Sequence, residues 1–280
     1  MKKLSFIFGI LGAFVLLFVS CTHESVVSQL AFGALAGLCA YVGVFRKLDL
    51  EDANFYIFVI LTLTLSFVLE DLFLRDDPNA NLMFYLCAYL LGSVPFGLIL
   101  AKSFAKVDIK ESGSKSIGAT NVLRVVKQDN PALAKKLAVA TFACDFLKAA
   151  LPILVLKFAG FDDNMLWSVG VFAVLGHCFS AYLCLEVGKG VASGAGVMVV
   201  LLPLELIIAL LVWFIVGKLF KISSLASLSA LIAFLIGAFT LHYEMSINTH
   251  SPVLVICFII VYKHIPNIKR LIFKEECKVV

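Results

Sequence analysis

The fold is decided by the stretch from residue 137 to residue 185, which reads LAVATFACDFLKAALPILVLKFAGFDDNMLWSVGVFAVLGHCFSAYLCL. It holds two apolar runs, 137–158 and 165–185, separated by a short polar break around Asp162, Asp163 and Asn164. A bilayer core of about 30 Å requires about 20 mostly apolar residues per helix. The stretch therefore predicts two membrane-spanning helices joined by a short polar loop.

The same pattern recurs along the chain and predicts an all-α polytopic membrane protein. Apolar residues make up 61% of the chain, charged residues only 15%, and the mean hydropathy is +1.02. A soluble domain cannot bury that much apolar surface. Pro203 divides the long apolar stretch that follows Val191. Ten spans are predicted, at about 4–20, 26–45, 55–74, 82–101, 137–158, 165–185, 191–204, 205–220, 225–241 and 250–263.

Basic residues mark one side of the membrane. They lie at Lys2 and Lys3, at Arg46 and Lys47, in the loop 102–136, and in the tail after residue 262, whereas the loops around residues 76–79 and 162–164 contain none. Loops rich in Lys and Arg stay in the cytoplasm. Both termini are therefore predicted to be cytoplasmic.

The N-terminus and the cysteines allow further interpretations. Lys2 and Lys3 precede an apolar run that ends at Cys21, which resembles a signal sequence, but the span count favours a retained helix. The eight cysteines form no CxxC pair that would suggest a metal or redox site, and a net charge of +4 does not suggest nucleic-acid binding. No cofactor or metal is expected.

The loop 102–136 contains a candidate phosphate site. Residues 112–124 read SGSKSIGATNVLR, in which backbone and hydroxyl donors stand beside the Arg124 guanidinium. Such a segment suits an anion, and phosphate most of all. A flexible linker whose lysines are attracted to anionic lipid headgroups explains the composition equally well.

Two further groups of polar residues fall on the same predicted side. Residues 188–194 read GKGVASG at the start of a predicted helix, where backbone amides and the Lys189 ammonium suit a phosphate. Ser224, His264 and Asn267 follow at other cytoplasmic helix ends. Because the three groups converge on one membrane face, a functional site is favoured over isolated structural residues.

These segments carry a resemblance to a known family. In order and spacing, residues 82–280 resemble the PlsY family, the bacterial acyl-phosphate:glycerol-3-phosphate acyltransferases. The family motif GSIP is matched by Gly92–Gly97, and the motif GSGNxGATNVLR is matched by Gly113-Ser114 with Gly118–Arg124. The motif DxLKG is matched by Asp145–Ala149, and the motif LGHxxPxxxxFKGGKGVAT by Leu175–His177 with Gly188–Ser193. The motif HxxNIxRL is matched by His264, Asn267, Ile268, Arg270 and Leu271, while Ser224 and Glu276 match a serine and a glutamate of the family.

The resemblance implies a fold and an activity. It implies a seven-helix core over residues 82–280, with residues 1–81 as an added segment of about three transmembrane helices, in a bacterial inner membrane with the active site facing the cytoplasm. The implied reaction transfers a fatty acyl group from acyl-phosphate to the sn-1 hydroxyl of glycerol 3-phosphate, giving lysophosphatidic acid and phosphate. Neither the HxxxxD pattern nor a GxSxG elbow is present, so direct transfer without an acyl-enzyme is expected.

The resemblance also implies which residues form the site. The catalytic residues expected are Ser114, Arg124, Lys189, His264 and Asn267. Substrate binding is expected from Ser224, Asn121, Thr120, Gly188, Gly190, His177 and Glu276. His177 also suits an interhelical hydrogen bond, and Asp145 and Lys148, three residues apart on one helix, suit an ion pair with a structural role.

Some positions depart from the family pattern. Lys115 and Ser116 replace Gly-Asn, Glu186 and Val187 replace Lys-Gly, and Ala149 replaces a glycine. Glu186 reverses a charge near a proposed phosphate, so a lipid-binding protein that has lost activity is one alternative. An organic-phosphate transporter is the other, although the cationic groups lie at one membrane face rather than at its midplane.

Overall fold

The computed structural model describes residues 78–183 and 188–276. The three predicted spans before residue 78, and with them nearly all of the proposed 1–81 segment, lie outside these residues, as do Glu186 and Val187. The chain divides into two compact units, residues 1–82 with 249–258 and residues 83–248 with 259–280. The second unit contains every candidate site residue.

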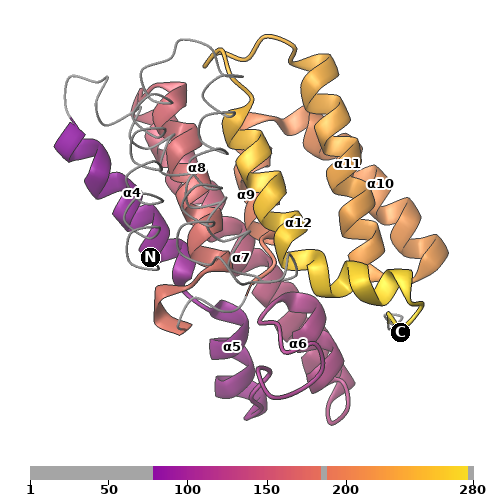
Figure 1. The fold of residues 1–280 in the computed structure, drawn as a ribbon. Helices are drawn as coiled ribbons and strands as arrows, with labels where there is room; N and C mark the ends of the chain where they lie inside the picture. The colour runs from indigo at the N-terminus through magenta and orange to yellow at the C-terminus, as the bar shows by residue number, and fades with distance from the viewer. Residues whose placement is uncertain (1–77, 184–187, 277–280) are drawn as a thin grey trace, which may run out of the picture. The chain divides into compact units, whose positions relative to one another are not determined.

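The described residues form helices joined by turns and loops, which confirms the all-α prediction (Figure 1). Two short elements are not α-helical, the π-helical turn Ala101–Ala105 and the 3-10 turn Ala181–Leu183. The α-helices are α4 (Pro78–Ser93), α5 (Phe96–Leu100), α6 (Ala119–Val126), α7 (Pro131–Phe158), α8 (Asp163–Cys178), α9 (Val191–Leu201), α10 (Pro203–Phe220), α11 (Ser223–Leu241) and α12 (Ser251–Ile272).

Six helical segments in the described part of the chain are long and apolar enough to cross a membrane. They are Asn81–Ala105, Pro131–Phe158, Asp163–Leu183, Pro203–Phe220, Ser223–Leu241 and Ser251–Ile272. The predicted span 191–204 corresponds to α9, whose 11 residues extend about 16 Å and cannot cross a bilayer alone. The helix ends next to Pro203 as predicted, because Leu202 leaves the helical conformation and a new helix begins at Pro203.

Helix α9 is a packing element between longer helices. It packs against α7 and α8. A Cβ added at Gly196 would lie 2.2 Å from the Phe146 carbonyl oxygen, so only glycine allows this approach of α9 to α7. Helices α10 and α11 pack side by side (Figure 1). The Glu205 carboxylate, at the start of α10, bonds to His242 just after α11.

Two helix boundaries differ from the prediction. Helix α7 begins at Pro131 rather than at residue 137, because the Asn130 side chain caps it by accepting from the Leu133 amide at 3.0 Å. The predicted span 82–101 is interrupted between α4 and α5, where Pro95 supplies no backbone N–H. The first difference follows from a capping side chain followed by a proline, and the second from a proline inside the apolar run.

The predicted long loop 102–136 is a small folded layer. It contains α6, which packs against α7. A buried cluster joins the layer to the rest of the unit, made of Leu98, Ala101, Ile109, Ile117, Val122, Val125, Val126, Ala134 and Leu137. The linker interpretation of this segment is therefore wrong, since its apolar residues are buried as in a folded core.

Candidate active site

A carboxylate lies at the centre of the candidate site. Glu276, after the end of α12, accepts hydrogen bonds from Ser224 Oγ at 2.8 Å and from Asn267 Nδ2 at 2.6 Å, and it forms an ion pair with Arg270. Burial opposes the charge of Glu276, but the hydrogen bonds from Arg270, Asn267 and Ser224 hold its pKa below the ordinary value. The start of α11, the end of α12 and the tail thus meet at one anion.

Lys189 adds a second cation to this group. It lies in the loop before α9, and burial lowers its pKa to about 8. The Glu276 carboxylate counteracts this effect, whereas the guanidinium groups of Arg270 and Arg124 add to it. Lys189 therefore interacts with two guanidinium groups and one carboxylate that come from other segments, an arrangement that suits phosphate groups.

The Lys189 loop is fitted closely to the end of α8. Gly190 has φ +79°, and a Cβ there would lie 2.8 Å from Cys178 Sγ. A Cβ at Gly188 would lie 2.2 Å from two ring atoms of His177 and 2.4 Å from its carbonyl oxygen. Both glycines are thus required by the close approach of the backbone, which fixes where Lys189 can lie.

Asn121 organises the loop that contains Ser114. Its Nδ2 donates to the carbonyl oxygens of Ile109, Ser112 and Ser116 at 2.9, 3.2 and 2.8 Å, and its Oδ1 accepts from the Ser114 amide at 2.8 Å. The side chain is buried. The structure therefore commits the Asn121 amide to the loop backbone, and its contribution to a site is through the shape of this loop.

The loop is tied to the α11 end of the site. Thr120 Oγ1 lies 3.3 Å from Ser223 Oγ, one residue before Ser224. This contact joins α6, which carries Arg124, to the helix that carries Ser224. The starts of α6 and α11, which the sequence placed on one membrane face, are thus close in space.

His264 is buried near the same centre. Its Nδ1 donates to the Ile260 carbonyl oxygen at 2.7 Å, and its electrostatic neighbours include Lys189 and Glu276. In a neutral imidazole this assignment leaves Nε2 as an acceptor. His264 can therefore accept a hydrogen bond from a substrate hydroxyl.

His177 takes a different position among the predicted site residues. It is buried at the end of α8, with Nδ1 3.5 Å from Asp145 Oδ1. Asp145 also pairs with Lys148 at 2.8 Å, which confirms the predicted ion pair. The contacts of His177 are thus with α7 and with the backbone of the Lys189 loop, rather than with the Glu276 cluster.

The chain is similar to known proteins over most of its length. A family model described as glycerol-3-phosphate acyltransferase matches residues 82–274. The chain belongs to this acyltransferase family. A glycerol-3-phosphate acyltransferase from Campylobacter jejuni subsp. doylei is 65% identical over 200 residues, covering 71% of this chain and 99% of that protein. One from Aliarcobacter butzleri is 58% identical over 202 residues, covering 72% and 98%.

Solved structures of the acyltransferase family agree. PlsY (YgiH), an integral membrane glycerol 3-phosphate acyltransferase crystallised in its glycerol 3-phosphate form, is 35% identical with a TM-score of 0.63, covering 71% of this chain and 96% of that one. Its lysophosphatidic acid form gives 35% and 0.62. The resemblance to the PlsY family is thereby confirmed, and this chain is an integral membrane protein of that family.

One residue of the acyltransferase site was not among the expected site residues. Arg270 forms an ion pair with the central carboxylate and contributes to the electrostatics of Lys189. The signal was available, because Arg270 lies three residues after Asn267 and so falls on the same helical face. Its partner in the tail is what the sequence alone does not identify.

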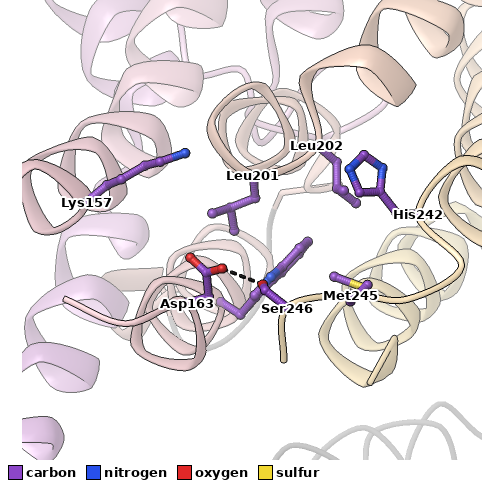
Figure 2. A pocket seen from close by; sticks show the side chains of 8 residues that line it. Lys157, Asp163, Leu201, Leu202, His242, Met245 and Ser246 are labelled. Atoms are coloured by element: carbon purple, nitrogen blue, oxygen red, sulfur yellow. Dashed lines mark hydrogen bonds between the residues drawn. The ribbon is translucent and has the colours of Figure 1, made fainter. Parts of the chain in front are cut away.

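Figure 2 shows side chains that line a pocket between α7, α8, α9 and the segment after α11. Its volume is about 240 Å³, and its lining residues are Lys157, Asp163, Trp167, Leu201, Leu202, His242, Met245 and Ser246. His242 follows the last residue of α11, whereas Ser224 lies in its first turn, so about 27 Å of helix separates the two. The pocket is therefore not part of the Glu276 cluster.

Proposed function

We propose that this chain transfers a fatty acyl group from an acyl-phosphate to the sn-1 hydroxyl of glycerol 3-phosphate. The products are lysophosphatidic acid and inorganic phosphate. The observation that carries the proposal is that Lys189 interacts with Arg124, Arg270 and Glu276, in a chain of the glycerol-3-phosphate acyltransferase family. Both substrates bear a phosphate, and a group of cations serves both.

The residues divide the work by their chemistry. Lys189 and Arg124 hold phosphate groups, and the loop containing Ser114 supplies donors beside them. Ser224 and Asn267 each give one hydrogen to Glu276, which fixes their orientation and leaves a lone pair on Ser224 and a second N–H and a carbonyl oxygen on Asn267. These groups orient glycerol 3-phosphate, together with the free Nε2 of His264.

The reaction needs little covalent help from the protein. The sn-1 oxygen of glycerol 3-phosphate attacks the acyl carbonyl carbon, a new ester C–O bond forms, and the C–O bond to phosphate breaks. The leaving phosphate takes up the hydroxyl proton, so atoms and charge balance without an acyl-enzyme. Positioning of the two substrates and stabilisation of charge on the departing phosphate supply the catalysis.

The proposed setting is the inner membrane of a bacterium, with the site open to the cytoplasm. Arg124, Lys189 and Arg270 lie on the side that the loop charges predict to be cytoplasmic. The acyl chain of the donor lies among the membrane helices, and glycerol 3-phosphate arrives from the aqueous side. Residues 82–280 are proposed as the acyltransferase core, with residues 1–81 as an added membrane segment of about three helices.

The test uses the purified full chain in detergent. Palmitoyl-phosphate, palmitoyl-CoA and palmitoyl-acyl carrier protein are offered with glycerol 3-phosphate, and the acylated position of the product is determined. We expect sn-1 lysophosphatidic acid from palmitoyl-phosphate alone, lost in Lys189→Ala and kept in Lys218→Ala, a lysine at the end of α10 that rests on the Phe214 ring. Product from the other donors, or an sn-2 ester, would contradict the proposal.

A vesicle experiment addresses the transporter alternative. The protein is reconstituted, and counterflow of labelled glycerol 3-phosphate is followed without any acyl donor. We expect no counterflow, because the cations gather at one end of the helices. Counterflow in the absence of acyl transfer would indicate that the protein is a transporter and not an enzyme.

A further inference from the structure

We propose that Asp145 and His177 form a positioning unit that holds the Lys189 loop in place for acyl transfer. Neither residue touches the Glu276 cluster, so they act through the loop and not on the substrate. The proposal rests on the phosphate-binding role given above to Lys189. It assigns a task to a buried polar group that the membrane interior would otherwise disfavour.

The unit is buried between two helices. Asp145 and Lys148 on α7 and His177 on α8 have side chains that are only 2%, 2% and 4% exposed. Asp145 Oδ1 lies 2.8 Å from Lys148 Nζ and 3.5 Å from His177 Nδ1. One carboxylate therefore neutralises the lysine and lies within ion-pair distance of the imidazole, whose orientation it favours electrostatically.

The imidazole ring of His177 packs against the backbone of the Lys189 loop. At Gly188 an added Cβ would lie 2.2 Å from both Cδ2 and Nε2 of His177, so the backbone at this position packs directly on the imidazole. Lys189 is the next residue. A tilt of the ring would therefore move the peptide that carries the phosphate-binding lysine.

The other end of the loop is tied to the same aspartate. Ser193 Oγ, in the first turn of α9, donates to the Asp145 carbonyl oxygen at 2.9 Å, and this bond is buried. Residues on both sides of Lys189 are thus connected to Asp145. Gly188 is connected through the His177 ring, and Ser193 through the Asp145 backbone carbonyl. A merely structural ion pair requires neither contact.

A purely structural role is the competing explanation. Lys148 Nζ also donates to the Val94 carbonyl oxygen at 2.9 Å, at the break between α4 and α5. In that case Asp145 would serve only to neutralise Lys148. Loss of Asp145 alone cannot separate the two roles, because it leaves a buried lysine unpaired and destabilises the protein under either one.

Paired substitutions separate them. Asp145→Leu with Lys148→Met removes both charges and leaves His177 without a polar partner, while Asp145→Asn with Lys148→Met keeps an oxygen for His177. Replacing a buried ion pair by apolar residues of similar size is often neutral for stability. Both double variants should therefore keep a Tm near that of the parent.

Their activities should differ. A displacement of about 1 Å costs about 100-fold in rate, so we expect kcat/KM for glycerol 3-phosphate to fall about 10- to 100-fold in the Leu/Met variant, mainly through KM. The Asn/Met variant should stay close to the parental value. Ser168→Ala is the matched control, a buried serine on α8 whose Oγ bonds only within its own helix to the Asn164 carbonyl oxygen.

If both double variants keep the parental kcat/KM and the parental Tm, the proposal is overturned. If the double variants fail to fold, His177→Ala, which removes the ring from Gly188, should reduce kcat/KM in folded protein; parental kcat/KM in this variant would again overturn the proposal. If the parent itself shows no transfer to glycerol 3-phosphate, the proposed function fails instead, and the two failures are told apart by that measurement.

Discussion

Replacing Gly188 with alanine tests how closely the Lys189 loop is fitted to α8. The new Cβ would lie 2.2 Å from the His177 ring and 2.4 Å from the His177 carbonyl oxygen. Ordinary contacts between such atoms are about 3.5 Å, so the groups must separate by more than about 1 Å. The carbonyl belongs to the α8 backbone and cannot turn aside, so the loop has to move.

The displacement passes directly to Lys189, the next residue. A misplacement of about 1 Å costs about 100-fold in rate, which corresponds to about 2.7 kcal/mol of transition-state free energy. Overpacking itself costs about 1–3 kcal/mol of folding free energy, so Tm should fall as well. We therefore expect kcat/KM for glycerol 3-phosphate to drop about 100-fold in protein that is still folded.

The assay is acceptor-dependent phosphate release from palmitoyl-phosphate, measured at temperatures well below Tm. Gly217→Ala is the matched control, because the added Cβ would meet only the Ala226 Cβ at 3.6 Å, an ordinary contact. It should retain parental kinetics. Parental kcat/KM in Gly188→Ala would contradict this close fit, since it would show that the loop accepts the added Cβ without moving Lys189 out of its working position.

Three further predictions follow from the same structure. Lys189 loses its proton as the pH rises through its pKa of about 8, so KM for glycerol 3-phosphate should rise between about pH 7 and 9. In Lys189→Arg the KM should stay level over this range, because arginine keeps its charge. A rise of KM in Lys189→Arg would show that another group is titrating. Gly113→Ala should lower Tm, because φ is +64° and the Cβ would lie 2.3 Å from Asn121 Oδ1; an unchanged Tm by thermal denaturation would contradict this. Glu205→Ala should lower Tm by removing the partner of His242 while leaving kcat/KM unchanged, since the pair lies at the opposite end of α11; a kinetic defect at normal Tm would disprove the separation.

The membrane helices could be predicted because lipid imposes their length. The runs around 137–158 and 165–185 are mostly apolar over the span of a bilayer, and helices appear there. The break at Pro203 follows from the missing N–H of proline. Helix α6 could not be read in the same way, because an eight-residue helix depends on tertiary packing, here against α7.

The site could be predicted as a set of residues but not as an arrangement. Charge and motif spacing placed Arg124, Lys189 and Asn267 on one membrane face. Glu276 as the central anion depends on a hydrogen bond to Ser224, 52 residues away, which no local pattern reveals. The role of Asn121 was likewise hidden, because an amide that shapes a loop and an amide that binds substrate look alike in sequence.

Direct acyl transfer at this site can be tested by its stoichiometry. Purified full-length chain is given palmitoyl-phosphate with and without glycerol 3-phosphate, and phosphate and lysophosphatidic acid are measured together in the parent and in Lys189→Ala. We expect one phosphate to be released per lysophosphatidic acid formed, only when the acceptor is present, and both products to be lost in the variant. Phosphate release without acceptor, a trapped acyl-enzyme, or full activity of Lys189→Ala would contradict direct transfer at this site.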